Sequence, residues 1–323
     1  MMKAVVYTRY GTPDVLQLCE RPVPEPKQGQ VLVKVHATTI NDWDWTLLRG
    51  KPHLLRLMSG PIKPKIPVLG TEVAGVVAAR GEGVTQFATG DRVYGDLSEA
   101  GFGGFAEYVC APESELHPMS PGMTFEQAAS LPHAGLLALQ GLVNVGAIRQ
   151  GDRVLINGAG GGVGAIGLGI AKTYGCKVTG VDKTSKLNAM NTMGFDETLD
   201  YEQTDFTTCG HRYDLVLDAK TTRSPFSYLN ALNPGGRYVT VGGHLNRLFQ
   251  MLCVGPVINR LSGKQLKILS LKPNRGLEKI NDLFEAGALN CLIDGPFSLA
   301  GLPEAMERFG RADHLGKVVV NVV

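Results

Sequence analysis

The chain of 323 residues is long enough for two domains of ordinary size or one large one, and its 44% hydrophobic and 19% charged residues are typical of a packed globular protein. A net charge of +2, with no run of Lys or Arg, argues against bulk electrostatic binding to nucleic acid. The 41 glycines cluster without a fixed period, which excludes a fibrous repeat.

The chain opens with KAVVYT, residues 3–8, which predicts a strand rather than an export signal. No run approaches the roughly 18 apolar residues that a membrane-spanning helix needs. The six cysteines are scattered and include no C-x-x-C pair, so neither a zinc ribbon nor a disulfide framework is predicted. Such cysteines are typical of a reducing compartment. We therefore expect a cytoplasmic protein, with neither membrane nor nucleic acid among its partners.

The first 123 residues have the character of strands and turns. β-Branched runs at residues 30–40 and 73–79 alternate with segments rich in Pro and Gly. From Thr124 the pattern changes, because residues 124–146 have helical spacing and Thr124 followed by Gln127 is a capping-box start.

A regular alternation of short apolar strands and helical segments follows. Strands are expected at residues 153–157, 177–182, 213–219, 237–243 and 266–271, with helical segments at 163–175, 186–194 and 224–236. Uninterrupted apolar strands between helices predict a parallel sheet that is covered on both faces. The tail holds one more helix and ends in an apolar strand, KVVVNV, that we expect to return to the N-terminal domain. The predicted fold is α/β: a Rossmann doubly wound parallel-sheet domain, residues 124–271, inserted in a mainly β domain formed by residues 1–123 and 272–323.

The most specific segment is a glycine turn after the first of these strands. It consists of Gly158, Ala159, Gly160, Gly161, Gly162, Val163 and Gly164. Read from Ala159 it is A-x-G-x-x-G, a turn that brings the backbone close to a pyrophosphate and packs a helix tightly on a strand. The N-terminus of that helix offers N–H groups and a partial positive charge to phosphates. Because the turn joins a strand to a helix and Asp182 ends the next strand, it predicts a dinucleotide site.

The residues after the second strand bear on which dinucleotide is bound. Asp182 is placed to accept from both ribose hydroxyls and to repel a 2′-phosphate, which favours NAD(H). Lys183 and Lys186 are placed to pair with that phosphate, which favours NADP(H), or they are solvated lysines at a helix entry. The choice between the two cofactors stays open.

Two later strand ends add cofactor-binding candidates. Gly242 and Gly243 end the strand at 237–243, where glycines let a ligand approach the crevice of such a sheet. Asp218 lies near the end of the strand at 213–219, and it either reaches the same crevice or caps the following turn.

Several phrases taken together resemble the medium-chain dehydrogenase/reductase superfamily. They are GTEVAGVV (70–77), ATGDRVYG (88–95), GFAEYVCAP (104–112), LPHAGLLALQGL (131–142), GDRVLINGAGGGVG (151–164) and HLGKVVV (314–320). They run over essentially the whole chain in the expected order. Within the superfamily the chain is similar to the zinc-free quinone oxidoreductase branch, which also holds enone and enoyl reductases. The resemblance implies that the mainly β domain is GroES-like.

The resemblance also bears on metal binding. In the zinc alcohol dehydrogenases of the superfamily a GHE phrase stands where this chain has Gly-Thr-Glu, and the zinc-binding histidine is Thr71 here. The two cysteine ligands of that group fall close to Asn41 and Ala134, and neither position carries a cysteine. His133 alone does not hold zinc. We therefore expect no metal, and a basic or backbone partner for the carboxylate of Glu72.

The missing ligands favour one chemistry. Without a metal to polarise an alcohol, hydride delivery to an electron-poor carbon is the easier reaction. We expect a zinc-independent, NAD(P)H-dependent oxidoreductase that reduces a quinone or the activated C=C of an α,β-unsaturated carbonyl, with a small hydrophobic electrophile as substrate. The alternatives are a metal-free alcohol dehydrogenase and a dinucleotide-binding scaffold with a non-catalytic role.

The segment INDWDW, residues 40–45, resembles the NPxDxxxR phrase of this branch. By that resemblance Asn41 faces the nicotinamide and the substrate, and its amide donates to a carbonyl; otherwise it is a turn residue. Trp43, Trp45 and Thr71 are the candidates for the substrate pocket, although the tryptophans are equally expected in a core. The apolar segment 244–261 lines a pocket, covers a partner subunit or forms a buried helix. A homodimer through an edge strand at 267–271 is implied by resemblance.

Overall fold

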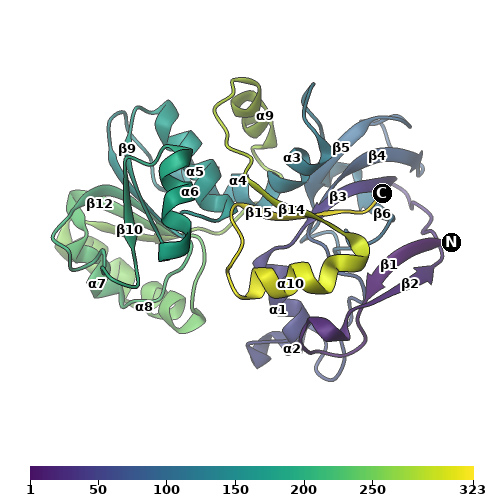
Figure 1. Cartoon of the computed structure of the whole chain (residues 1–323), viewed down its shortest axis with the longest axis horizontal. Helices are drawn as coiled ribbons and strands as arrows, with labels where there is room; N and C mark the ends of the chain where they lie inside the picture. Colours follow the sequence, from purple (N-terminus) through teal and green to yellow (C-terminus); the bar gives the residue numbers. More distant parts are fainter. The chain divides into compact units, whose positions relative to one another are not determined.

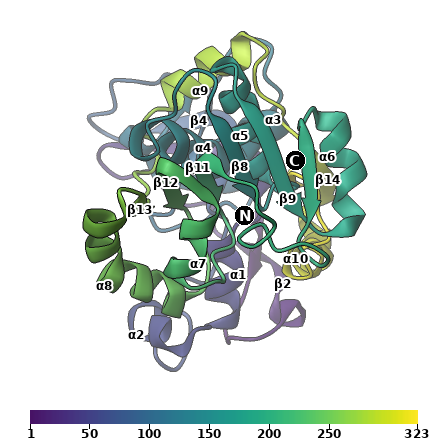
Figure 2. The same cartoon turned by 90° about the vertical axis from the view of Figure 1, so that its left-hand side faces the viewer.

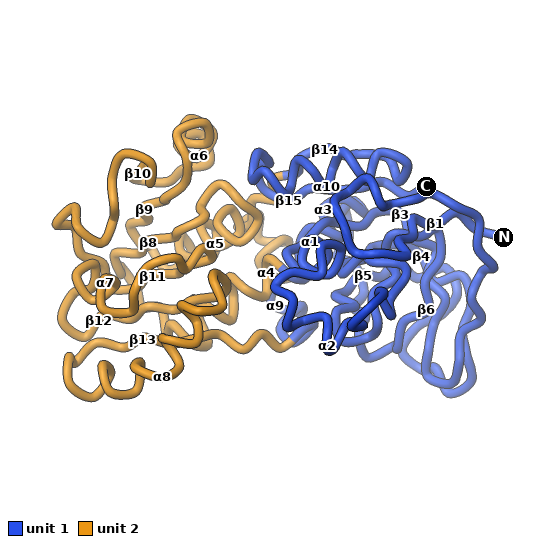
Figure 3. Tube along the Cα trace, turned by 90° about the horizontal axis from the view of Figure 1, so that it is seen from below, with its two compact units in different colours: residues 1–133, 273–281, 293–323 blue, residues 134–272, 282–292 orange.

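The structure is a computed structural model that describes residues 1–323, and it divides into two compact units (Figure 3). Unit 1 comprises residues 1–133, 273–281 and 293–323, and unit 2 comprises residues 134–272 and 282–292. Unit 2 is therefore an insertion in unit 1. Helix α3 (Phe125–Ser130) lies in unit 1 because it packs against five strands of that unit, whereas the sequence pattern assigned residues from 124 onward to the inserted domain.

Unit 1 is built on a seven-stranded sheet with the order β14-β15-β3-β4-β5-β7, and β6 pairs with β3 (Figure 1). Its strands are β1 (Met2–Val6) and β2 (Gln17–Arg21), which form a separate pair, and β3 (Gln30–Thr39), β4 (Glu72–Arg80), β5 (Arg92–Asp96), β6 (Tyr108–Pro112), β7 (His117–Pro118), β14 (Ile293–Ser298) and β15 (Lys317–Asn321). Its other helices are α1 (Asp42–Arg49), α2 (Arg56–Ser59) and α10 (Leu302–Gly310), and α9 (Leu277–Glu285) begins in it. The tail thus holds two helices where the pattern predicts one.

The pairing of β15 with β3 brings the C-terminal strand against a strand from the N-terminal part of the chain. The strands run antiparallel, with Val319 opposite Thr39 and Asn321 opposite Ala37. The backbone N–H of Ile40 donates to the carbonyl of Val318 at 3.1 Å. The expected return of the last strand to the N-terminal domain is confirmed.

Unit 2 is a six-stranded parallel sheet with the order β10-β9-β8-β11-β12-β13 (Figure 2). Its strands are β8 (Arg153–Asn157), β9 (Lys177–Asp182), β10 (Glu197–Asp200), β11 (Tyr213–Asp218), β12 (Leu232–Thr240) and β13 (Gln265–Ile268). Its helices are α4 (Pro132–Leu139, which starts in unit 1), a π-helical turn (Gln140–Val145), α5 (Gly162–Thr173), α6 (Leu187–Met193), α7 (Pro225–Asn230) and α8 (Leu245–Ser262). The strand order reverses between β8 and β11, as in doubly wound dinucleotide-binding folds.

The burial of each strand explains which strands of this sheet the apolar pattern predicts and which it misses. Val154, Leu155 and Ile156 of β8 are fully buried, because both faces of a parallel sheet are covered. All five expected strands are present, but the sixth, β10, is an edge strand with the polar sequence ETLD and carries no apolar signal. Strand β12 begins earlier than its apolar run, since it pairs with β11 from Leu232.

Candidate functional site

The first candidate site lies in unit 1 and is centred on a buried carboxylate. Glu72 begins β4, and its side chain has no exposed surface. Its Oε1 accepts from the backbone N–H of His133 at 2.6 Å, and its Oε2 accepts from the Lys317 ammonium at 2.6 Å and from Asn41 Nδ2 at 2.7 Å. The Thr39 hydroxyl also donates to Oε2. The expectation of basic and backbone partners for Glu72 is therefore confirmed.

Asn41 is held at both ends of its amide. Its Oδ1 accepts from the Lys317 Nζ at 2.5 Å, while its Nδ2 donates to Glu72. The residue is 4% exposed, and it is the N-cap of α1. Its backbone N–H donates to Asp44 Oδ2 at 2.9 Å, which forms a capping box, and the helix ends at Gly50 in the left-handed region. Asn41 is thus both the residue at which the chain turns into α1 and a buried amide whose orientation is fixed.

Asp44 connects Asn41 to the position that carries zinc-binding histidine in the resembling enzymes. Thr71 is fully buried, and its hydroxyl donates to Asp44 Oδ2 at 3.0 Å, while the backbone N–H of Gly70 donates to Oδ1 at 2.9 Å. Burial raises the pKa of Asp44 to about 6, and the hydrogen bonds from Gly70, Asn41 and Thr71 limit that rise. The hydroxyl of Thr71 is therefore already hydrogen-bonded to the carboxyl group of Asp44 on α1.

A second buried ion pair adjoins Glu72. His133 Nδ1 lies 2.8 Å from Asp96 Oδ2, and both side chains are almost fully buried. Burial alone would lower the pKa of His133, but the hydrogen bond and charge of Asp96 outweigh it and raise the pKa above its usual value. From the sequence, His133 was considered only as a metal ligand. The structure gives it the carboxylate of Asp96 as a partner instead.

The two tryptophans of α1 have different surroundings. Trp45 packs against the core cluster that includes Leu302 and Met306, and Arg49 lies over its ring at 4.9 Å from the centroid. An added Cβ at Gly310 would come within 2.3 Å of the Trp45 ring, so the fit is tight. Trp43 is 44% exposed. Of the three pocket candidates, Trp45 is therefore partly buried against the core of unit 1, Thr71 is buried and Trp43 is exposed.

The second candidate site is the glycine turn of unit 2. Gly158 follows β8 with φ of +85°, and its N–H donates to the carbonyl of Val181 at 3.0 Å. Gly161 is the N-cap of α5 and provides no side-chain cap, so the first N–H groups of this helix, at Gly162, Val163 and Gly164, are free to bind an anion.

The space around each glycine separates a packing role from a ligand role. A Cβ on Gly164 would lie 2.3 Å from the carbonyl oxygen of Ala159, which only a shift of the helix would relieve. A Cβ on Gly161 would meet nothing closer than the Gly158 oxygen at 3.5 Å. Gly164 is thus required for helix–strand packing, whereas Gly161 borders open space at the helix N-terminus. These residues fit the pyrophosphate of a dinucleotide.

Asp182, at the end of β9, makes contacts that the sequence did not reveal. Its Oδ2 accepts from the N–H of Gly160 at 2.9 Å, its Oδ1 accepts from the N–H of Lys183 at 2.9 Å, and the Lys186 ammonium lies 3.8 Å away. Lys186 is only 4% exposed, so it is not a solvated lysine at the helix entry. Asp182 therefore also braces the glycine turn.

Asp218, the candidate at the end of β11, lies in a buried cluster of polar side chains in unit 2. Asp218 has no exposed surface and accepts from Asn157 Nδ2 at 2.7 Å, from the Tyr238 hydroxyl at 2.6 Å and from the N–H of Lys220 at 2.8 Å. Burial raises the pKa of Asp218, and the hydrogen bond from Tyr238 limits that rise. Asp218 thus both caps the following turn and links the ends of the two central strands.

The glycine pair after β12 is also structurally demanding. Gly243 has φ of +145°, and a Cβ there would come within 2.5 Å of the Thr221 carbonyl oxygen. Gly242 has more room, with the Ala219 oxygen at 3.3 Å. Gly243 is therefore fixed by backbone packing, and a side chain at Gly242 would be less crowded but still in close contact with backbone.

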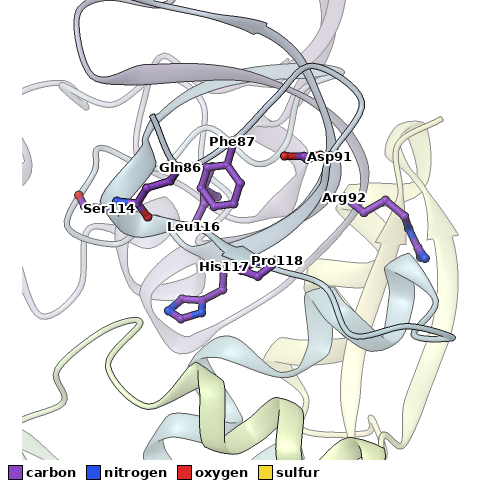
Figure 4. Close-up of a pocket in the computed structure, with 8 residues that line it drawn as sticks. All are labelled: Gln86, Phe87, Asp91, Arg92, Ser114, Leu116, His117 and Pro118. Carbon is purple, nitrogen blue, oxygen red and sulfur yellow. The ribbon is translucent and has the colours of Figure 1, made fainter. Parts of the chain in front are cut away.

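The cavity shown in Figure 4 is distinct from these residues. It lies in unit 1, measures about 530 Å³ and is lined by Gln86, Phe87, Asp91, Arg92, Ser114, Leu116, His117 and Pro118. The Arg92 guanidinium donates to the Met123 carbonyl at 2.5 Å and covers the Phe125 ring, so its charge already has partners. No residue that the sequence proposes for the site lines this cavity.

Comparison with known proteins decides the family. The model of the alcohol dehydrogenase GroES-like domain matches residues 27–121, and that of a zinc-binding dehydrogenase matches residues 193–320. The chain is 31% identical to the chloroplast envelope quinone oxidoreductase homolog of Arabidopsis thaliana, over 99% of this chain and 98% of that protein. This chain belongs to the medium-chain dehydrogenase/reductase superfamily, in its quinone oxidoreductase-like branch. The expected GroES-like and Rossmann domains are confirmed.

Two further relatives of this medium-chain dehydrogenase/reductase cover the whole chain. The NADPH-dependent alkenal/one oxidoreductase of Arabidopsis thaliana is 31% identical over 99% of this chain and 79% of its own length. The solved structure of the quinone oxidoreductase from Coxiella burnetii superposes with a TM-score of 0.86 at 28% identity, over 100% of this chain and 99% of that one.

One of the two matching family models is that of a zinc-binding dehydrogenase, and a zinc site in a protein is built from side chains that can act as ligands. No group of three or more His, Cys, Asp or Glu side chains is arranged to hold a metal ion. Thr71 stands where the resembling enzymes carry a zinc-binding histidine, and its hydroxyl donates to Asp44; Asn41, close to the expected position of a cysteine ligand, accepts from Lys317. These residues do not fit a zinc site, and we derive no step through a metal. No helix is long and apolar enough to cross a membrane.

The sequence missed one member of the unit 1 site. In the sequence Lys317 stood out only as part of the phrase HLGKVVV. Its role was missed because it is 276 residues away from its partner Asn41 in the sequence. The signal that would have found it is the pairing of β15 with β3, which sets a lysine at the start of the last strand beside the end of β3. A strand register of this kind is not visible in a single sequence.

Proposed function

We propose that this chain is a zinc-independent, NAD(P)H-dependent reductase that delivers hydride to a quinone or to the activated C=C of an α,β-unsaturated carbonyl. The observation that carries the proposal is the buried cluster of Asn41, Glu72 and Lys317. Close to a position to which the resemblance assigns a zinc ligand, this chain has the amide of Asn41, oriented by Glu72 and Lys317. The named activities of its relatives, on quinones and on alkenals and enones, support the same substrate class.

The residues of unit 1 supply hydrogen bonding rather than covalent chemistry. A bound nicotinamide dinucleotide supplies the hydride, and negative charge then develops on the acceptor's carbonyl oxygen. Asn41 Nδ2 carries two hydrogens. One of them donates a hydrogen bond to Glu72, so the second is available to donate to that oxygen. A small hydrophobic electrophile needs only this donor and a proton from solvent or a hydroxyl group.

The residues of unit 2 would hold the dinucleotide. The N–H groups at the start of α5 bind the pyrophosphate, with Gly161 leaving room for its approach. Asp182 favours an unphosphorylated ribose, whereas Lys183 and Lys186 favour a 2′-phosphate. Asp218, Gly242 and Gly243 border the carboxyl ends of β11 and β12, where ligands of such sheets bind.

The experiment is a spectrophotometric assay of reduced nicotinamide on protein treated with a metal chelator. NADPH and NADH are each offered with a benzoquinone, a naphthoquinone and a simple enone, and the oxidised cofactors are offered with a primary and a secondary alcohol. We expect oxidation of one reduced cofactor by a quinone or enone, at the same rate with and without chelator. Turnover of alcohols that the chelator abolishes would refute the proposal.

The proposal includes a cytoplasmic homodimer that uses neither membrane nor nucleic acid. All six cysteines are free, as expected in a reducing compartment. Strand β13 is an edge of its sheet, and the neighbouring α8 exposes Phe249, Leu252 and Leu261 beside a groove of about 370 Å³. Light scattering on the purified chain tests the dimer, and a monomer at all concentrations would contradict it.

A further inference from the structure

We propose that Lys317 is a positioning residue for the reduction: it fixes the orientation of the Asn41 amide, so that one N–H of that amide remains directed away from Glu72 and toward an acceptor. The inference rests on the proposed function, because it assigns Asn41 the contact with the substrate carbonyl. It adds a residue for which neither the family resemblance nor the relatives' names give a role.

The hydrogen-bonding groups of a lysine limit what can lie beside it. A lysine ammonium has three donors and no acceptor, so an amide can face it at hydrogen-bond distance only with its oxygen. Lys317 Nζ lies 2.5 Å from Asn41 Oδ1, and a flipped amide would place its NH₂ against this cation. Glu72 Oε2 fixes the other end, because a carboxylate can only accept. The two charged partners therefore select one orientation of the Asn41 side chain.

The cluster is arranged so that this selection is strong. Lys317 and Glu72 are 2.6 Å apart, with side chains 7% and 0% exposed, and Asn41 is 4% exposed. Water therefore does not compete for these hydrogen bonds. A cation on the amide oxygen also polarises the amide and makes its N–H a better donor. The orientation and the donor strength of Asn41 thus both depend on Lys317.

The backbone holds Lys317 in place from a different part of the chain. It begins β15, whose neighbouring residue Val318 accepts from the N–H of Ile40, the residue before Asn41. The ammonium reaches Asn41 from the C-terminal strand, while Asn41 itself is fixed as the N-cap of α1. Neither residue needs the other for its backbone position, so a side-chain substitution at Lys317 can release the amide without moving α1.

The kinetic test compares Lys317→Met and Lys317→Arg, each alone and in an Asn41→Ala background, with the full chain and NADPH. We expect Lys317→Met to lower kcat by about tenfold or more through misplacement of the donor, with the Kd for NADPH unchanged. Lys317→Arg should restore most of the activity. In the Asn41→Ala background the methionine should have no further effect on kcat, because the group that it releases is gone. An equal loss in both backgrounds would overturn the inference.

A matched control separates positioning from general loss of stability. Arg237 is a buried cation in unit 2 whose guanidinium pairs with Asp152 at 2.5 Å, as Lys317 pairs with Glu72 in unit 1. Arg237→Met is expected to destabilise the chain but to leave kcat unchanged. A loss of kcat in Arg237→Met as large as in Lys317→Met would show that the effect is structural and would overturn the inference.

A second measurement does not depend on activity. In protein labelled with ¹⁵N-asparagine, the side-chain signal of Asn41 is identified by its loss in Asn41→Asp. We expect two separate Nδ2 hydrogen signals in the wild type and in Lys317→Arg, with slow exchange for the hydrogen that donates to Glu72, and fast exchange of both hydrogens in Lys317→Met. An unchanged signal in Lys317→Met would overturn the inference. If the wild type reduced no acceptor, the proposed function would fail, while this signal would still decide whether Lys317 orients Asn41.

Discussion

Removal of the Lys317 charge is expected to destabilise unit 1 strongly. Lys317→Met takes away the ammonium 2.6 Å from Glu72, whose side chain is fully buried. Breaking a buried ion pair by removing one partner costs about 3–5 kcal/mol, because it leaves an uncompensated charge. Glu72 keeps three donors, from Asn41, His133 and Thr39. We therefore expect the lower end of this range, about 3 kcal/mol.

The assay is urea unfolding followed by tryptophan fluorescence. The only two tryptophans, Trp43 and Trp45, both lie on α1, so the signal reports unit 1 alone. Arg311→Met is the matched control, since it breaks an exposed ion pair of unit 1 and should cost less than about 1 kcal/mol. Adding Glu72→Gln to Lys317→Met should recover part of the loss, because no unpaired charge is then buried.

A stability of Lys317→Met close to that of the wild type would contradict this prediction. If Lys317→Met unfolds within about 0.5 kcal/mol of the wild type, the size of an ordinary surface substitution, then the ammonium is not the main compensation for the buried carboxylate. A double variant that is less stable than Lys317→Met would point the same way, because it would show that the charge of Glu72 is satisfied without the lysine.

Three further predictions concern both units. Gly161→Val should abolish NADPH-induced fluorescence quenching without loss of stability, whereas Gly164→Val should lower the unfolding midpoint followed by far-UV circular dichroism, which also reports unit 2, because its side chain meets backbone; equal midpoints for the two would contradict the assignment. Asp182→Ser should raise the NADPH/NADH ratio of kcat/KM, and an unaltered ratio would show that the carboxylate does not face the ribose. The pKa of His133 is raised by Asp96, so the stability that the pair contributes is present below the usual value of 6.5 and is lost as the pH rises through the raised pKa. The difference in urea midpoint between the wild type and His133→Phe should therefore shrink as the pH is raised from below 6.5, and a constant difference would disprove the link.

Local patterns explain why much of the fold could be predicted. The runs of buried residues in β8 and β9, and the capping box of Thr124 and Gln127, are signals within a few residues of sequence. The glycine turn is equally local, because a positive φ at Gly158 and the tight packing at Gly164 demand glycine itself. Each of these features is fixed by residues that are close together in the chain.

What could not be predicted depends on residues that are far apart in the sequence. Lys317 reaches Asn41 only through the register of β15 on β3. The partner of Asp182 within the glycine turn and the tie from Thr71 to Asp44 likewise follow from how loops fold back on each other. From the sequence, Asn41 was either a residue facing the nicotinamide and substrate or a turn residue, whereas Asn41 and Asp44 cap a helix that packs the partly buried Trp45 against the core.

The measurement that tests the central claim most directly follows the hydride itself. Chelator-treated protein is supplied with an enone and with reduced cofactor that carries deuterium at the transferred position, and the product is analysed by mass spectrometry, with the bound metal measured on the same sample. We predict one deuterium on the β-carbon of the saturated ketone and far less than one zinc per chain. A product without deuterium, or deuterium transfer that needs stoichiometric zinc, would contradict the account.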